Sequence, residues 1–180
     1  MIIAIVGKIG SGKTTAAKYL QQEFGFEVVK FSGFVRDILD RMHLEQTREN
    51  MSDLSTSLRK RFGKDIFSYV VKQDIKNKEK VIVEGVRTPE DLKGLKNRED
   101  FTLLAIDVDT ETRFKRLKDR SENCDDQTKT YEEFLEDHER KTETQIEEIM
   151  KDADVFIKND RNLKEFYQKL DKLVTDLNGN

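Results

Sequence analysis

The chain is poor in residues that cross-link a fold or interrupt it, with one cysteine, one proline, two histidines and no tryptophan. The single cysteine, Cys124, excludes an intramolecular disulfide, and we interpret it as an incidental exposed thiol. Without a Cys-x-x-Cys pair or a histidine cluster, the sequence offers no zinc site. No apolar run approaches the roughly 20 residues of a membrane-spanning helix, and no basic leader precedes the first apolar run. We therefore expect a cytoplasmic protein with no membrane partner.

An excess of charge of one sign is also missing. Thirty-three basic and 36 acidic residues give a formal net charge of −3. Such a chain has no general electrostatic attraction to nucleic acid, so we expect no nucleic-acid partner. Its 180 residues are enough for one domain with a sizeable core. We predict a single domain over residues 1–180 that acts as a monomer or homodimer.

A phosphate-binding loop is the most informative feature that the sequence does contain. Residues 7–14 read Gly-Lys-Ile-Gly-Ser-Gly-Lys-Thr and directly follow the apolar run 2–6. This is the Gly-x-x-x-x-Gly-Lys-Ser/Thr pattern in its strand–loop–helix setting, where backbone N–H groups form an anion site at a helix start. Lys13 can reach the β- and γ-phosphates, and the Thr14 hydroxyl can ligate Mg²⁺. The predicted contacts of a nucleoside triphosphate are Gly7, Lys8, Ile9, Gly10, Ser11, Gly12, Lys13, Thr14 and Thr15.

Strand-type runs alternate with helical patterns along the whole chain. Most of the strand-type runs are continuously apolar, as expected for parallel strands covered on both faces. We predict strands over residues 2–6, 27–31, 80–84, 101–107 and 154–158. We predict helices over residues 14–24, 34–42, 51–62, 65–76, 89–96, 110–119, 131–151 and 163–177. The alternation predicts an α/β protein, a three-layer α/β/α fold around a five-stranded parallel sheet.

Two mostly helical excursions interrupt this alternation, at residues 32–77 and 110–153. Both begin at the carboxyl ends of predicted strands, which is where ligands bind in open α/β sheets. We therefore expect residues 32–77 to hold a second substrate, the acceptor, and residues 110–153 to close over the triphosphate as a lid.

The third predicted strand ends in Glu84-Gly85-Val86-Arg87, beside the predicted phosphate loop. Glu84 can hold a Mg²⁺-bound water or orient an attacking phosphate oxygen, and Arg87 can clamp a phosphate with two hydrogen bonds. The alternative interpretation is that Glu84 and Arg87 form a structural ion pair at the strand end.

Further arginines occur in both excursions. Arg36 lies one helical turn after the second strand and suits an acceptor phosphate, or is an ordinary surface residue; Ser32 contacts the acceptor or caps the helix. Arg113, Arg116 and Arg120 lie on one helix face. They can neutralise charge on a transferring phosphoryl group, or they pair with surface carboxylates nearby.

Taken in this order, the motifs resemble the nucleoside-monophosphate-kinase branch of the P-loop kinases over nearly the whole chain. That family has Asp-Gly-x-(Pro)-Arg at the strand end, where this chain has Glu and lacks the proline. The resemblance implies a P-loop kinase fold, with Arg36 and Arg87 on the acceptor phosphate and lid arginines at 113, 116 and 120. From motif and resemblance together we assign catalysis to Lys13, Glu84, Arg87, Arg116 and Arg120. We assign nucleotide binding to Arg113 in addition to the loop, and acceptor binding to Ser32, Arg36 and Arg87. The predicted Mg²⁺ ligands are Thr14 and Glu84.

Within this branch, the segments at 48–65 and 86–90 are similar to two groups. One comprises the phage-type deoxynucleoside monophosphate kinases together with archaeal adenylate-kinase-like proteins, and the other is dephospho-CoA kinase. The resemblance implies transfer of the ATP γ-phosphoryl to a small phosphorylated acceptor, a nucleoside or deoxynucleoside monophosphate. Dephospho-CoA kinase is the alternative, although its usual aspartate after the second strand is replaced by Phe31-Ser32-Gly33. A regulatory ATPase with slow hydrolysis is an alternative of another class. The chain lacks an Asn-Lys-x-Asp guanine motif, so we expect ATP and Mg²⁺ as cofactors.

Overall fold

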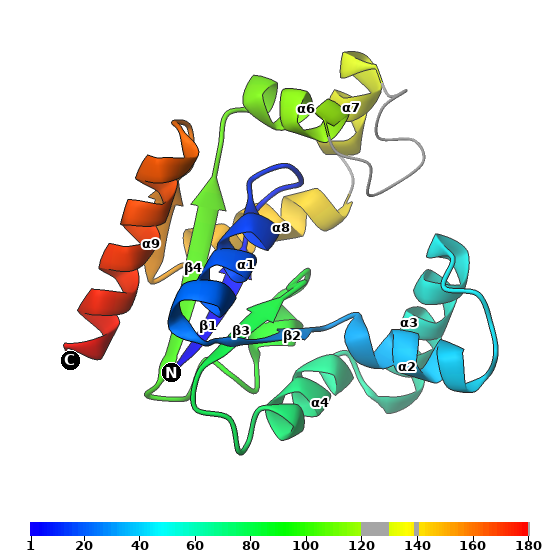
Figure 1. The fold of residues 1–180 in the computed structure, drawn as a ribbon. Coiled ribbons are helices and arrows are strands. Elements are labelled where there is room, and N and C mark those ends of the chain that lie inside the picture. The colour runs from blue at the N-terminus through cyan, green and yellow to red at the C-terminus, as the bar shows by residue number, and fades with distance from the viewer. Residues whose placement is uncertain (120–129, 139–140, 180) are drawn as a thin grey trace.

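A computed structural model describes residues 1–119, 130–138 and 141–179, so Arg120 and Cys124 lie outside the described residues. Five parallel strands form one sheet in the order β2-β3-β1-β4-β5 (Figure 1). The strands are β1 (Ile2–Val6), β2 (Glu27–Lys30), β3 (Val81–Glu84), β4 (Phe101–Asp107) and β5 (Val155–Lys158). The predicted five-stranded parallel sheet is confirmed.

Helices connect the strands and cover both faces of the sheet. They are α1 (Lys13–Phe24), α2 (Gly33–Arg41), α3 (Arg48–Phe62), α4 (Ile66–Asp74), α5 (Pro89–Leu92), α6 (Thr110–Asp119), α7 (Tyr131–His138), α8 (Lys141–Lys151) and α9 (Leu163–Asn178). Within the described ranges, none of these helices is long and apolar enough to cross a membrane.

The predicted single helix over residues 131–151 is wrong, because the structure has α7 and α8 in its place. The two helices bury their apolar residues against different partners. Phe134 of α7 packs against Phe114 of α6, with ring centroids 5.4 Å apart. Ile146 and Ile149 of α8 are buried in the core on the sheet.

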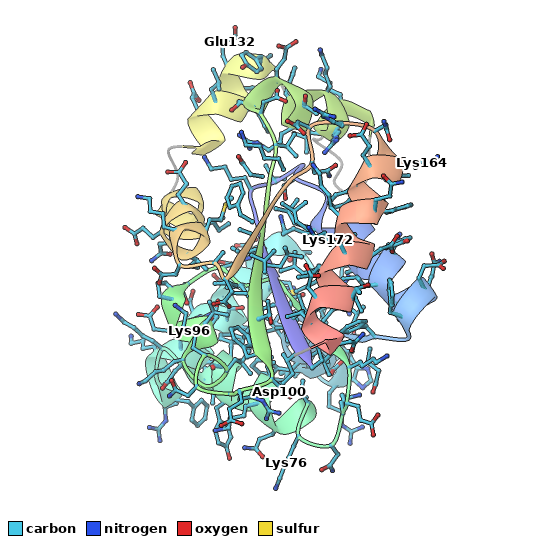
Figure 2. All side chains as sticks on the ribbon, turned by 90° about the vertical axis from the view of Figure 1, so that its left-hand side faces the viewer. Lys76, Lys96, Asp100, Glu132, Lys164 and Lys172 are labelled. Carbon is cyan, nitrogen blue, oxygen red and sulfur yellow. The ribbon has the colours of Figure 1, made fainter. Side chains whose placement is uncertain are left out.

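Side-chain alternation along the strands divides the core into two layers. On β1, Ile3 and Ile5 face the layer formed with α1 and α9, whereas Ile2, Ala4 and Val6 face the layer formed with α2, α4, α5 and α8. Figure 2 shows α9, marked by Lys164 and Lys172, on the opposite side of the sheet from α8. The central strands β1, β3 and β4 are covered on both faces and are mostly apolar, and the predicted three-layer α/β/α architecture is confirmed.

The parallel register brings the carboxyl ends of the strands to one edge of the sheet. Ile5 of β1 pairs with Glu84 of β3, and Glu84 pairs in turn with Lys30 of β2. On the other side, Asp107 of β4 pairs with Lys158 of β5. Figure 1 shows the loop after β1 at this edge, with α6 and α7 beyond it. Polar residues that follow the strands therefore converge here.

A polar contact joins α1, which follows the first loop, to the last helix α9. The Tyr19 hydroxyl donates a hydrogen bond of 2.6 Å to Asp171, and the Tyr19 ring stacks on Tyr167 with centroids 3.9 Å apart. The hydrogen bond to Asp171, together with burial, raises the pKa of Tyr19 to about 12. The contact holds the two helices together on one face of the sheet.

The substitution Tyr19→Phe should lower the free energy of unfolding by about 1 kcal/mol near neutral pH, because one net hydrogen bond is lost. The contribution is present below pH 10 and is lost as the pH rises through about 12, since the folded state holds the phenolic proton more tightly than the unfolded chain. Urea unfolding at several pH values measures it. Tyr69→Phe is the control, since Tyr69 is exposed; equal losses in both variants would contradict the assignment.

Candidate functional site

The loop after β1 is packed from beneath so closely that its glycines are required. Gly10 and Gly12 have φ angles of +80° and +101°, which side-chain-bearing residues rarely adopt. A Cβ atom on Gly10 would lie 2.7 Å from the Arg113 carbonyl oxygen, and one on Gly12 would lie 2.5 Å from Asn159 Nδ2. A Cβ on Gly7 would lie 2.4 Å from a backbone oxygen of β4. The loop backbone is therefore held against α6, β4 and the segment after β5.

Lys13, the first residue of α1, lies against the same loop. Its Nζ donates hydrogen bonds to the carbonyl oxygens of Gly7, at 2.6 Å, and Lys8, at 3.0 Å. The next side chains, Thr14 and Thr15, begin α1, where free backbone N–H groups and the helix dipole favour an anion. A phosphate group bound here would offer the Lys13 ammonium a charged acceptor in place of neutral carbonyls. The loop is thus arranged as an anion-binding site.

Arg113 supports the loop from α6. Its side chain is buried, and it donates hydrogen bonds to the carbonyl oxygens of Val108, at 3.2 Å, and Ile9, at 3.5 Å, and to the Thr110 hydroxyl, at 3.1 Å. Its guanidinium lies 5.5 Å from the centre of the Phe134 ring. The structure therefore places Arg113 where it holds the loop backbone through Ile9.

Lys8 and Ser11 complete the loop. Lys8 forms an ion pair with Glu147 of α8, and its carbonyl oxygen accepts a hydrogen bond from the Ser11 backbone N–H at 3.1 Å. Ser11 is buried, and its carbonyl oxygen accepts a bond of 2.9 Å from Asn159 Nδ2. The loop therefore contacts α6, α8 and the segment after β5 at once.

A cleft of about 250 Å³ lies beside Asn159. Arg116 borders it and donates a 2.9 Å hydrogen bond to the Asn159 carbonyl oxygen, while burial lowers the pKa of its guanidinium. Asn159 is buried and directly follows β5. The residues that line the cleft are Gly12, Thr15, Arg116, Asn159, Arg161 and Leu163. Through Gly12 and Thr15 the cleft adjoins the phosphate loop.

Glu84 lies at the end of β3 and is only 7% exposed. Its carboxylate oxygen Oε2 is 3.4 Å from Nζ of Lys30, the neighbouring residue in the parallel register. The alternative of a Glu84–Arg87 ion pair is wrong, because Lys30 takes that place. Arg87 is exposed, and among the described residues its guanidinium has no hydrogen bond or ion pair. A buried carboxylate and an exposed arginine therefore stand at the same strand end.

The residues predicted to bind the acceptor in the first excursion lie on α2. Ser32 stands at the N-cap position, but its side chain makes no capping hydrogen bond. Arg36 is exposed and donates a 2.5 Å hydrogen bond to Gln46, which in turn donates one of 2.6 Å to Asp40. Arg36 therefore points toward the connection between α2 and α3.

The described residues contain no group of three or more His, Cys, Asp or Glu side chains that could hold a metal ion. The predicted ligands are the Thr14 hydroxyl at the start of α1 and the Glu84 carboxylate at the end of β3, and oxygen donors suit a hard cation such as Mg²⁺. Mg²⁺ usually keeps several waters and binds through one or two protein oxygens plus substrate phosphates, so this small donor set fits it.

A family model described as AAA domain matches residues 6–134 of the chain. The UPF0200 protein of Pyrococcus horikoshii is 30% identical over 100% of this chain and 99% of its own length. The UPF0200 protein of Methanocaldococcus jannaschii is 27% identical over 100% of this chain and 92% of its own.

Solved structures with the same fold include shikimate kinases. The enzyme from Bacteroides thetaiotaomicron has a TM-score of 0.61 and 17% identity over 97% of this chain and 98% of its own. The enzyme from Aquifex aeolicus has a TM-score of 0.54 and 19% identity over 99% of this chain and 97% of its own. These likenesses, with the strand order and the loop, confirm the predicted P-loop kinase fold. The chain belongs to the UPF0200 family, and the residues matched by the AAA-domain model include its whole phosphate loop.

Proposed function

We propose that the protein is a kinase that transfers the γ-phosphoryl group of ATP to a small phosphorylated acceptor, a nucleoside or deoxynucleoside monophosphate. One observation carries the proposal: the phosphate loop and a second anion-binding group, the exposed Arg87 guanidinium, lie at the same edge of the sheet. A second anion-binding group at this edge suits an acceptor that itself carries a phosphate.

ATP would bind with its phosphates on the loop and its base in the neighbouring cleft. The loop N–H groups and Lys13 suit the triphosphate. In the cleft, the planar guanidinium of Arg116 and the apolar side chain of Leu163 suit a flat aromatic base. This would give Arg116 a role on the base, in addition to or instead of the catalytic one predicted for it. Mg²⁺, held by Thr14 and through water by Glu84, would neutralise charge on the β- and γ-phosphates.

In the transfer, an acceptor oxygen forms a bond to the γ-phosphorus while the bond to the β–γ bridging oxygen breaks, and ADP leaves. An oxygen of a monophosphate is already ionised near neutral pH and needs no base, whereas a hydroxyl acceptor must lose a proton. The Glu84 carboxylate at this strand end is already held by the Lys30 ammonium. This favours a monophosphate over a hydroxyl acceptor such as dephospho-CoA.

The two helical excursions would serve this reaction as the sequence predicts. Residues 32–77 would hold the acceptor, with Ser32, Arg36 and Arg87 around its phosphate. Residues 110–153 would close over ATP, and the arginines of α6 would move with that segment. The domain would then act as one unit over residues 1–180.

A screen of acceptors tests the proposal. Nucleoside and deoxynucleoside monophosphates, unphosphorylated nucleosides, dephospho-CoA and shikimate are each incubated with ATP and Mg²⁺, and ADP release is measured. We expect rapid release with one or more monophosphates. Rapid release only with a hydroxyl acceptor would move the assignment to that class. Slow release that no acceptor accelerates would make the protein a regulatory ATPase.

Lys13→Ala should reduce phosphoryl transfer by roughly 100-fold or more, because a preorganised charge contact to the transferring group is lost. Its melting temperature should stay close to that of the wild type. Steady-state kinetics with saturating ATP measures the loss, and Lys18→Ala, an exposed lysine on the same helix, is the control. A Lys13→Ala variant that keeps more than about a tenth of the wild-type turnover would overturn the role of Lys13.

Glu84→Gln should lower turnover more than it weakens ATP binding. The amide keeps the size of the side chain but loses the charge that orders Mg²⁺ or its water. Turnover and ATP affinity are measured as functions of Mg²⁺ concentration. Unchanged turnover with a lower melting temperature would instead make Glu84 a structural partner of Lys30.

Arg87→Ala should lower kcat/KM for the acceptor by roughly 10- to 100-fold, since the acceptor phosphate loses a charged partner worth about 1.5–3 kcal/mol. ATP affinity should hardly change. Titration calorimetry with ATP and with the acceptor separates the two effects, and Arg98→Ala at the opposite end of the sheet is the control. If both affinities fall equally, Arg87 belongs to the triphosphate site.

A further inference from the structure

Asp91 is a buried carboxylate that none of the roles above explains. It lies in the four-residue helix α5 and is 0% exposed. Its oxygen Oδ2 accepts hydrogen bonds from two successive backbone N–H groups, those of Arg87 at 2.9 Å and Thr88 at 3.0 Å. The carboxylate therefore fixes the backbone from which the Arg87 side chain extends.

The other oxygen of Asp91 reaches a distant part of the chain. Oδ1 accepts a 2.8 Å hydrogen bond from Arg59 of α3, 32 residues earlier in the sequence. The same guanidinium donates a 2.6 Å bond to the Lys64 carbonyl oxygen and lies 4.1 Å from the centre of the Phe67 ring of α4. Arg59 is therefore fixed to α3, to the α3–α4 connection and to α4 at once.

A simple helix cap does not require this arrangement. Asp91 is the N3 residue of the capping box that starts α5, with Thr88 as the N-cap, and this role needs only the one oxygen that accepts the Thr88 backbone N–H. Only a carboxylate accepts on both oxygens, from the two backbone N–H groups on one side and from the Arg59 guanidinium on the other. The pair also leaves Asp91 buried but neutralised, which a lone carboxylate at 0% exposure would not be.

We propose that Asp91 is a positioning residue of the acceptor site. It sets the point from which Arg87 enters the site, and through Arg59 it ties that point to the helix pair α3–α4. Movement of these helices on acceptor binding is then transmitted to Arg87 through a rigid, charge-paired contact. The inference rests on the proposed function, since it assumes that Arg87 binds the acceptor.

Arg59→Lys tests the proposal with little risk to the fold, because lysine keeps the positive charge near Asp91. It loses the planar fork that contacts Asp91, the Lys64 carbonyl and the Phe67 ring together. We expect the acceptor KM to rise by roughly tenfold, since the misplaced Arg87 would lose most of a charged hydrogen bond to the acceptor phosphate. ATP affinity and kcat should stay within about twofold. Asp91→Asn, which can serve only one side of the contact, should have the same effect.

Arg98→Lys is the matched control. Arg98 also pairs with an aspartate through two hydrogen bonds, of 2.8 Å and 3.0 Å to Asp100. Figure 2 shows Asp100 at the end of the molecule opposite α7, which Glu132 marks. This variant should leave the acceptor KM unchanged. If Arg59→Lys and Asp91→Asn lower the melting temperature but also leave the acceptor KM unchanged, Asp91 is only a structural cap and the proposal is overturned.

A readout without activity separates this inference from the proposed function. In ¹⁵N NMR spectra of the whole chain, Arg59→Lys should shift the backbone amide resonances of Arg87 and Thr88, whereas Arg98→Lys should not. Unmoved resonances would overturn the connection from Arg59 through Asp91 to the Arg87 backbone, whatever the enzyme does. If the wild type transfers phosphate to no phosphorylated acceptor, the proposed function fails, and the shifts still decide whether Asp91 transmits the position of α3 to Arg87.

Discussion

The close packing beneath the phosphate loop is the constraint on which the rest of the site depends. The loop backbone touches the Arg113 carbonyl and the Asn159 side chain so closely that a methyl group in place of a glycine hydrogen would collide with them. As a result the loop shape is determined jointly by β1, by α6 and by the segment after β5. A displacement of α6 would therefore displace the loop as well. A closing lid would act on the loop through this contact.

At the end of β3 and just after it, the two buried carboxylates are paired with basic side chains, whereas one arginine is not paired with a carboxylate. The buried carboxylates Glu84 and Asp91 each have a basic partner, Lys30 and Arg59, so neither is left as an uncompensated buried charge. The Arg87 guanidinium, between them in the sequence, is exposed and has no partner among the described residues. A basic group that is held in place by its backbone but not neutralised is suited to bind a ligand anion.

The sequence predicted the parts of the fold that depend on local patterns. Short strand-type runs located all five strands, and most of these runs are continuously apolar, since central strands buried on both faces carry no polar alternation. The loop motif located Lys13 and Thr14, because glycine spacing and a following helix are local features. The prediction failed for residues 131–151, where two helices replace one. Helical periodicity there did not reveal that Phe134 packs on α6 and Ile146 on the sheet.

The sequence by itself thus determined the class of fold, the anion-binding loop and the strand end at Glu84–Arg87, because each is encoded within a few consecutive residues. Only the tertiary structure decided the partners: Lys30 rather than Arg87 for Glu84, Ile9 for Arg113, and Arg59 for Asp91. These contacts join residues about 30 to 100 positions apart in the sequence. The sequence alone offers several possible partners for each charged side chain. Strand order, register and helix packing select one of them.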